Sequence, residues 1–144
     1  MVVMMFFLGF QVSEAQVGIN TPTPLSTLDI NGNLSLKTIG IPTALNGGPA
    51  FGATPINDGV YISLTPLSGS QEFQIPNAAA VPGRIYILRN ISTTVTAQVY
   101  ATTPSLFFAK DSATTTGGVL NLPSTGTLKT VIVISDGQNW TYFF

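Results

Sequence analysis

Residues 128–144 constrain the fold of this chain more than any other stretch; they read LKTVIVISDGQNWTYFF. Residues 131–134 form an unbroken run of Val and Ile, which favours a strand because β-branched side chains are restricted in helices. Residues 135–139 have the composition of a turn, and residues 140–144 continue as an aromatic strand. We therefore expect a β-hairpin here, at the centre of a β-domain onto which the rest of the chain packs.

Short β-rich segments precede this hairpin. They lie at residues 60–65, 72–75, 84–89, 94–100, 106–108 and 119–122. Turn residues separate them at intervals of roughly 8–12 residues, which is typical of a sandwich or barrel. No helical period is sustained, and Pro82 limits residues 78–80 to one helical turn. These patterns predict an all-β fold with an antiparallel β-sandwich or jelly-roll-like domain over residues 59–144.

Two of the expected strands, at residues 84–89 and 131–134, are apolar on both faces. Either a central strand buried on both sides or a subunit interface explains this pattern. Charged residues make up only 8% of the chain, against roughly 25% in an average soluble protein. A surface with so few ions assembles more readily into oligomers or fibres, which favours the interface.

Residues 16–38 predict an extended arm that carries a small hairpin. Pro22 and Pro24 hold the chain in a non-helical path. Asn31-Gly32 lies between two alternating segments, residues 28–30 and 34–36, and this dipeptide favours a type I′ hairpin turn. One small hairpin is not stable alone, so we expect the arm to dock on the main domain or on another copy of the chain. The candidate self-assembly residues are Val17, Ile19, Leu25, Leu28 and Ile30.

The two remaining segments are interpreted as a signal peptide and a connection. Residues 1–10 are apolar, and Ser13-Glu14-Ala15 is a small-x-small cleavage site, so we expect a signal peptide over residues 1–15 and secretion. A buried N-terminal strand is the alternative. The apolar run is shorter than the about 20 residues that a spanning helix needs, so no transmembrane span is expected. Residues 39–58 are rich in Gly and Pro and predict a linker or a long surface loop.

The residue types present argue against an enzyme and against several kinds of binding site. The chain has no Cys and no His, which removes thiolate chemistry, the usual neutral-pH proton carrier and the commonest transition-metal ligand. Its few basic residues are scattered, which excludes nucleic-acid binding by phosphate neutralisation. Lys110-Asp111-Ser112 is the only tight cluster of candidate catalytic groups, and we interpret it as a solvated loop. We expect no catalytic activity, no metal and no cofactor.

Aromatic side chains offer the only candidate ligand site. Trp140 and Tyr142 share one face of the last strand, and Tyr100 ends an earlier one. They are interpreted either as core anchors, which is the reading we prefer for the last strand, or as platforms on which sugar rings stack.

Two parts of the chain resemble a known group of proteins. Residues 15–33 read AQVGINTPTPLSTLDINGN and resemble a segment with the pattern VGIGTxxPxxxLDVxGN. That segment opens many secreted surface proteins of Bacteroidota and also occurs in phage tail fibres. Asn20 stands where the pattern usually has its second Gly. The segments FQIPN, PGRIYILRN and SDGQNW resemble the β-rich module that often follows. The resemblance implies an exported, all-β, non-enzymatic protein that self-associates as a trimer or filament. Asp111-Ser112-Ala113 resembles an O-glycosylation site of these bacteria, which makes Ser112 a candidate acceptor.

These observations lead to one expected function and one alternative. We expect a non-enzymatic extracellular structural protein, a self-assembling fibre or filament subunit or a fibre-tip module on the cell surface. It would assemble through its N-terminal arm and its apolar strands, with other copies of itself as partners. The alternative is a surface adhesin or carbohydrate-binding module with surface glycans as partners.

Overall fold

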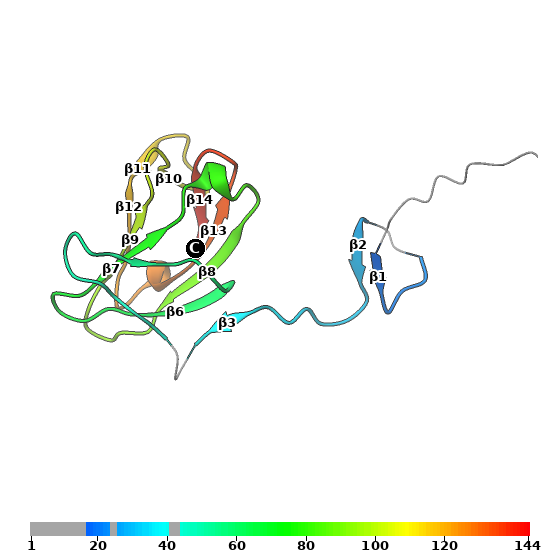
Figure 1. Ribbon diagram of the computed structural model, residues 1–144, viewed down its shortest axis with the longest axis horizontal. Helices are drawn as coiled ribbons and strands as arrows, with labels where there is room; N and C mark the ends of the chain where they lie inside the picture. The colour runs from blue at the N-terminus through cyan, green and yellow to red at the C-terminus, as the bar shows by residue number, and fades with distance from the viewer. Residues whose placement is uncertain (1–16, 24–25, 41–43) are drawn as a thin grey trace, which may run out of the picture. The chain divides into compact units, whose positions relative to one another are not determined.

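The computed structural model describes residues 17–23, 26–40 and 44–144. Strands and two short 3₁₀ turns account for every regular element in these residues, so the protein is all-β as expected. The chain divides into two compact units, Met1–Ser35 and Leu36–Phe144 (Figure 1). We refer to the first as the arm and to the second as the β-domain.

The arm contains two strands that pair in parallel, β1 (Val17–Ile19) and β2 (Leu28–Ile30). The hairpin expected across Asn31-Gly32 is therefore wrong, and residues 33–37 form no strand. The chain after β2 is bonded to the end of β1 instead. The N–H of Asn31 donates to the carbonyl of Ile19 at 3.0 Å, and Nδ2 of Asn20 donates to the carbonyl of Asn31 at 3.1 Å. These bonds outcompete the local turn preference of Asn31-Gly32.

The β-domain is a sandwich of two sheets (Figure 1). The larger sheet has the strand order β11-β10-β14-β13-β8-β6-β3, with β4 also paired to β6, and the smaller has the order β12-β9-β7-β5. The strands are β3 (Thr38–Ile39), β4 (Leu45–Asn46), β5 (Thr54–Pro55), β6 (Tyr61–Thr65), β7 (Glu72–Ile75), β8 (Ile85–Asn90), β9 (Ala97–Ala101), β10 (Phe107–Ala109), β11 (Thr115–Gly117), β12 (Val119–Leu122), β13 (Thr130–Ser135) and β14 (Trp140–Phe143). The 3₁₀ turns are η1 (Ala78–Ala80) and η2 (Thr127–Lys129).

The chain winds between the two sheets from β4 to β9. Each successive strand joins the opposite sheet, so strands that neighbour each other in a sheet are separated by one strand in sequence and run parallel. The expectation of an antiparallel sandwich is therefore corrected, because both sheets contain parallel as well as antiparallel pairs. The strand of the opposite sheet serves as the crossover that parallel neighbours require. The predicted hairpin β13–β14 is confirmed, with Ser135 opposite Trp140.

The described residues of the segment that we expected to be a linker or a long surface loop, 39–40 and 44–58, belong to the β-domain and do not form a linker. They supply β4 and β5, and the side chain of Ile56 is buried in the core. The N–H groups of Gly47 and Gly48 donate to the carbonyls of Thr65 in the larger sheet and Glu72 in the smaller sheet. A Cβ at Gly48 would collide with the backbone of Gly52, so only glycine allows this close approach. The domain thus begins well before residue 59.

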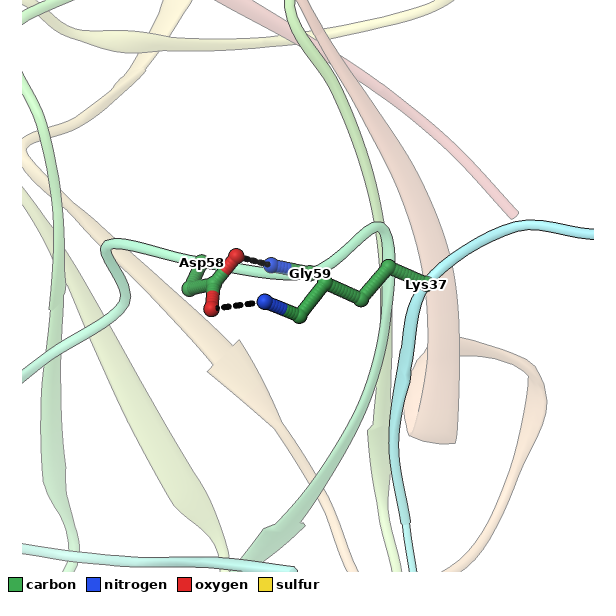
Figure 2. Close-up of polar contacts among 3 residues, drawn as sticks. All are labelled: Lys37, Asp58 and Gly59. Carbon is green, nitrogen blue, oxygen red and sulfur yellow. Dashed lines mark hydrogen bonds and ion pairs between the residues drawn. The ribbon is translucent and has the colours of Figure 1, made fainter.

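An ion pair ties the first residues of the β-domain to the start of β6 (Figure 2). Nζ of Lys37 bonds to one carboxylate oxygen of Asp58, and the other oxygen accepts a bond from the N–H of Gly59 at 2.8 Å. The hydrogen bond from Lys37, and next that from Gly59, lowers the pKa of Asp58. The carbonyl of Lys37 also accepts from the N–H of Val60 at 2.8 Å.

The core lies between the two sheets and contains the only Trp of the chain. Trp140 is fully buried against Tyr86, with ring centroids 5.7 Å apart, and its Nε1 donates to the carbonyl of Pro76 at 3.1 Å. The other core side chains are Ile56, Ile62, Leu64, Phe73, Ile75, Ala78, Leu88, Ala97, Val99, Phe107, Leu120, Leu122, Val131, Val133 and Tyr142.

Residues of the motifs FQIPN and SDGQNW hydrogen-bond to the turn η1 and within the turn that follows β13. Oγ of Ser135 donates to the carbonyl of Ala78 at 2.9 Å, and the N–H of Ala78 donates to Oγ of Ser105 at 2.9 Å. Asn77 caps η1 by accepting from the N–H of Ala79, and Asp136 accepts from the N–H groups of the turn that follows it. These motif residues therefore hold the two sheets and the last hairpin together.

Candidate functional site

The outer face of the larger sheet carries two rows of mainly apolar side chains, which we call the apolar ladder. The first row crosses four strands in direct register and consists of Tyr61, Ile87, Ile132 and Phe143. The second row consists of Ile85, Ile134, Thr141 and Phe108. These residues alternate along β8 and β13 with the core side chains of the same strands, so each strand is apolar on both faces.

The apolar ladder is partly open to solvent at its centre. Ile85 is 43% exposed, Ile132 is 41% exposed and Phe143 is 38% exposed. A shallow, open cavity of about 310 Å³ is lined by Ile132, Phe143 and Phe144. Neither row contains an ionisable side chain except the phenol of Tyr61. The pattern on β8 and β13 therefore arises from one buried face and one apolar surface, rather than from burial on both sides.

The smaller sheet has the opposite character on its outer face. Its outward side chains include Glu72, Gln74, Gln98, Tyr100 and Asn121, which alternate with the core residues of β7, β9 and β12. Such alternation is the common pattern for a sheet with one solvated face. The two outer faces of the sandwich thus differ in chemistry, and the apolar one departs from the usual pattern.

Two of the three candidate sugar-stacking residues belong to the core. Trp140 is fully buried and Tyr142 is 6% exposed, so neither ring can receive a ligand. The interpretation of these two residues as platforms is wrong, and their interpretation as core anchors is confirmed. The physical reason is that the inward face of β14 packs under the smaller sheet, where a large ring buries the most apolar area.

Tyr100 differs from these two because it lies on the outer face of β9. It borders a cavity of about 340 Å³ together with Glu72, Gln74 and Phe51. Its hydroxyl donates to Oε1 of Glu72 at 3.3 Å. Burial of the ring, and after it the charge of Glu72, raises the pKa of Tyr100. The phenol is therefore protonated at neutral pH and remains a hydrogen-bond donor.

Sequence reasoning missed the other residues of this cavity. Phe51 stands between Ala50 and Gly52 in the segment that was expected to be a linker or a long surface loop. A single aromatic residue among small residues, outside any alternating strand pattern, is a signal that could have marked it as a surface group. In the sequence, Glu72 and Gln74 are the polar residues of an alternating strand, and nothing else distinguishes them.

The candidate assembly residues of the arm are largely at the surface. Val17, Ile19 and Leu28 are each more than half exposed, and Ile30 is half-buried. Leu25 and the expected signal peptide over residues 1–15 lie outside the described residues. These assignments stay predictions.

Ser112, the candidate acceptor for a glycan, lies in the exposed turn between β10 and β11. Its Oγ donates to the carbonyl of Thr114 at 3.0 Å and accepts from the N–H of the same residue at 3.1 Å. Asp111 is paired with Lys110 at 3.7 Å. The hydroxyl thus has a local structural role, and its modification stays a prediction.

The described residues contain no group of three or more potential acidic, His or Cys ligands for a metal ion. Within the same residues, none of the helices is long and apolar enough to span a bilayer. Comparison of the chain with protein-family models, with curated proteins and with solved structures gives no match.

Proposed function

We propose that this protein is a non-enzymatic structural subunit that self-associates through the apolar ladder of its larger sheet. The observation that carries the proposal is the register of the first row, in which Ile132 stands directly between Ile87 and Phe143 across three adjacent strands. Such a continuous apolar strip on the solvent face of a sheet is a common property of interaction surfaces.

A second copy of the chain is the partner that fits this surface best. The apolar ladder carries no charge at neutral pH, so two such faces meet without bringing like charges together. Two basic residues lie beyond the rows, Arg89 opposite Thr130 in the register of β8 and β13 and Lys110 directly after β10. Their positions suit the polar rim that surrounds the apolar centre of an interface.

The arm supplies a second element for assembly. Its two strands are three residues long each, which is too short for an independently stable sheet. The exposed side chains of Val17, Ile19 and Leu28 would gain burial by docking on a neighbouring copy. The arm then links subunits into a fibre or filament, while the apolar ladder forms the main contact. The extracellular, cell-surface setting follows from the signal-like N-terminus and is part of the same proposal.

Analytical ultracentrifugation and negative-stain microscopy of the purified protein test this proposal. We expect concentration-dependent oligomers or filaments that dissociate in Ile132→Lys. Leu67→Lys is the matched control, because Leu67 is 56% exposed in the β6–β7 turn and lies in neither row. Circular dichroism checks that both variants fold, and the milder Ile132→Thr replaces Ile132→Lys if the charged variant does not. A monodisperse wild-type monomer at high concentration would refute the proposal.

A further inference from the structure

A second surface of the β-domain, on the opposite sheet, has the features of a ligand site. The cavity of about 340 Å³ beside Tyr100 opens on the outer face of β7 and β9, where Glu72, Gln74 and Tyr100 point away from the core. Thr103 borders it at one end and Phe51 at the other. Small-molecule sites range from about 300 to 1,000 Å³, so this cavity is sized for one or two small rings.

Phe51 is held in an unfavourable conformation at the edge of this cavity. Its φ is 64°, a value that bulky residues rarely adopt, and its side chain is fully exposed. Asn20 is the other described non-Gly residue with positive φ, and Asn tolerates it far better. The N–H of Phe51 donates to Oε2 of Glu72 at 3.1 Å, which fixes the position of the backbone. Backbone strain and an exposed aromatic ring at one residue beside a cavity are typical of a binding residue.

Glu72 organises the polar side of the same cavity. Oε2 accepts from Phe51, and Oε1 accepts from the hydroxyl of Tyr100. The carboxylate is therefore held in place by two donors, and each of its oxygens can accept one further bond from a ligand. Gln74 stands directly opposite Tyr100 in the register of β7 and β9 and is exposed, so its amide offers both donors and an acceptor.

This combination of groups fits a sugar better than other ligands. An exposed aromatic face packs against the C–H groups of a pyranose ring, while a carboxylate and an amide receive and donate bonds to its hydroxyl groups. Glu72 is the only ionisable group besides Tyr100 in the lining, and its negative charge disfavours acidic sugars and phosphates. We propose that the cavity binds a neutral hexose unit of a glycan, with the ring stacked on Phe51 and its hydroxyl groups bonded to Glu72 and Gln74.

The polar strip on the same sheet extends the proposed site beyond one sugar unit. Gln98 lies opposite Glu72 on one side and opposite Asn121 on the other. These amides continue the row of donors and acceptors from the cavity across β9 to β12. An oligosaccharide is therefore expected to bind more tightly than a monosaccharide, because neighbouring units reach these side chains.

Isothermal titration calorimetry of the full chain with five neutral hexasaccharides tests the site: cellohexaose, laminarihexaose, maltohexaose, isomaltohexaose and mannohexaose. We expect at least one to bind with a Kd below about 1 mM. Phe51→Ala should weaken that binding by about tenfold, because the stacking contact is lost. Phe144→Ala is the matched control and should leave it unchanged, since Phe144 is an exposed Phe that directly follows β14 in the larger sheet and does not line the cavity.

Two further measurements keep the result unambiguous. Tyr100→Phe removes only the hydroxyl that bonds to Glu72 and should weaken binding even if Phe51→Ala does not fold. Tetramethylammonium, titrated in parallel, tests a cationic ligand, which the carboxylate and the aromatic rings could also hold. The proposal is overturned if none of the five sugars binds, if Phe51→Ala or Tyr100→Phe binds as tightly as the wild type, or if only tetramethylammonium binds. Ultracentrifugation of Phe51→Ala separates this result from self-association, which the variant should retain.

Discussion

Asn90 bridges the two sheets of the β-domain by donating from Nδ2 to the carbonyl of Leu122 at 2.8 Å. The same amide nitrogen donates to the carbonyl of Val95 at 2.9 Å, and Oδ1 accepts from the N–H of Ser92 at 2.9 Å. The side chain is fully buried, so these bonds replace water for three backbone groups. Asn90 closes the PGRIYILRN motif and fastens the end of β8 to the edge of the smaller sheet.

Replacing this amide should be among the most damaging changes to stability. Asn90→Ala removes the partner of the buried carbonyl of Leu122 and of two part-buried backbone groups, and an unsatisfied buried group costs about 1–3 kcal/mol. We expect the free energy of unfolding to fall by about 2–5 kcal/mol in urea denaturation. Asn121→Ala is the matched control on the exposed face of β12 and should change it by less than about 0.5 kcal/mol. A small effect of Asn90→Ala would contradict the structural role assigned to the motif.

The close backbone contacts at Gly48 predict that alanine lowers the stability of the domain at this position and not at an open one. A Cβ at Gly48 would collide with the carbonyl oxygen of Gly52, whereas a Cβ at Gly118 would meet nothing within 4 Å. Gly48→Ala should therefore destabilise the domain by about 1–3 kcal/mol through overpacking. Gly118→Ala should be neutral or stabilise it by up to about 1 kcal/mol, because it restricts the unfolded chain. Thermal unfolding followed by circular dichroism compares the stability of the two variants. Equal changes in stability would contradict the close backbone approach at Gly48.

The sequence predicted where the strands of this fold lie along the chain better than it predicted which strands pair with one another. Alternation along β6 identifies Ile62 and Leu64 as inward-facing, but it does not say which strand lies beside them. The partner depends on the winding between sheets, which brings β6 next to β8 although β7 lies between them in sequence. The β13–β14 hairpin was predictable because a turn of local Asp-Gly chemistry joins its strands directly.

Contacts between residues distant in sequence also limited the predictions for the arm and for the candidate site. In the arm, Asn31-Gly32 favours a hairpin locally, yet the bond from Asn20 to Asn31 comes from a residue that is distant in sequence. The cavity beside Tyr100 is also a product of tertiary structure, since Phe51 and Glu72 lie 21 residues apart and meet where the segment before β5 lies beside β7. An aromatic residue in a strand can be either a core residue or a surface residue. Trp140 and Tyr100 differ because Trp140 lies on the inward face of its strand and Tyr100 on the outward face of its own.

Asp58 gives the β-domain a pH-dependent contact at acidic pH. Its pKa is lowered in the folded state, mainly by the hydrogen bond from Lys37. The contact therefore stabilises the folded chain above the unfolded pKa of about 3.9 and is lost as the pH falls through the lower, folded value. Lys37→Met should raise the pKa of Asp58 in a carboxyl-carbon NMR titration. Lys110→Met removes a lysine that pairs with Asp111 instead and should leave the pKa of Asp58 in place.

Self-association through the apolar ladder should respond to solvent as burial of apolar surface does. Salt at about 1 M shortens the screening length to about 3 Å, which weakens contacts between exposed charged groups but does not weaken apolar contacts. We therefore expect the oligomers to persist in about 1 M NaCl, to grow in ammonium sulfate and to weaken on cooling, because the hydrophobic contribution fades at low temperature. Sedimentation velocity of wild-type protein under these conditions measures the response, with Ile132→Thr as the variant that should remain dissociated throughout. Dissociation by NaCl alone would instead assign the contact to ion pairs between Arg89 or Lys110 and acidic groups of the other copy, and would remove Ile132 and Phe143 from the interface.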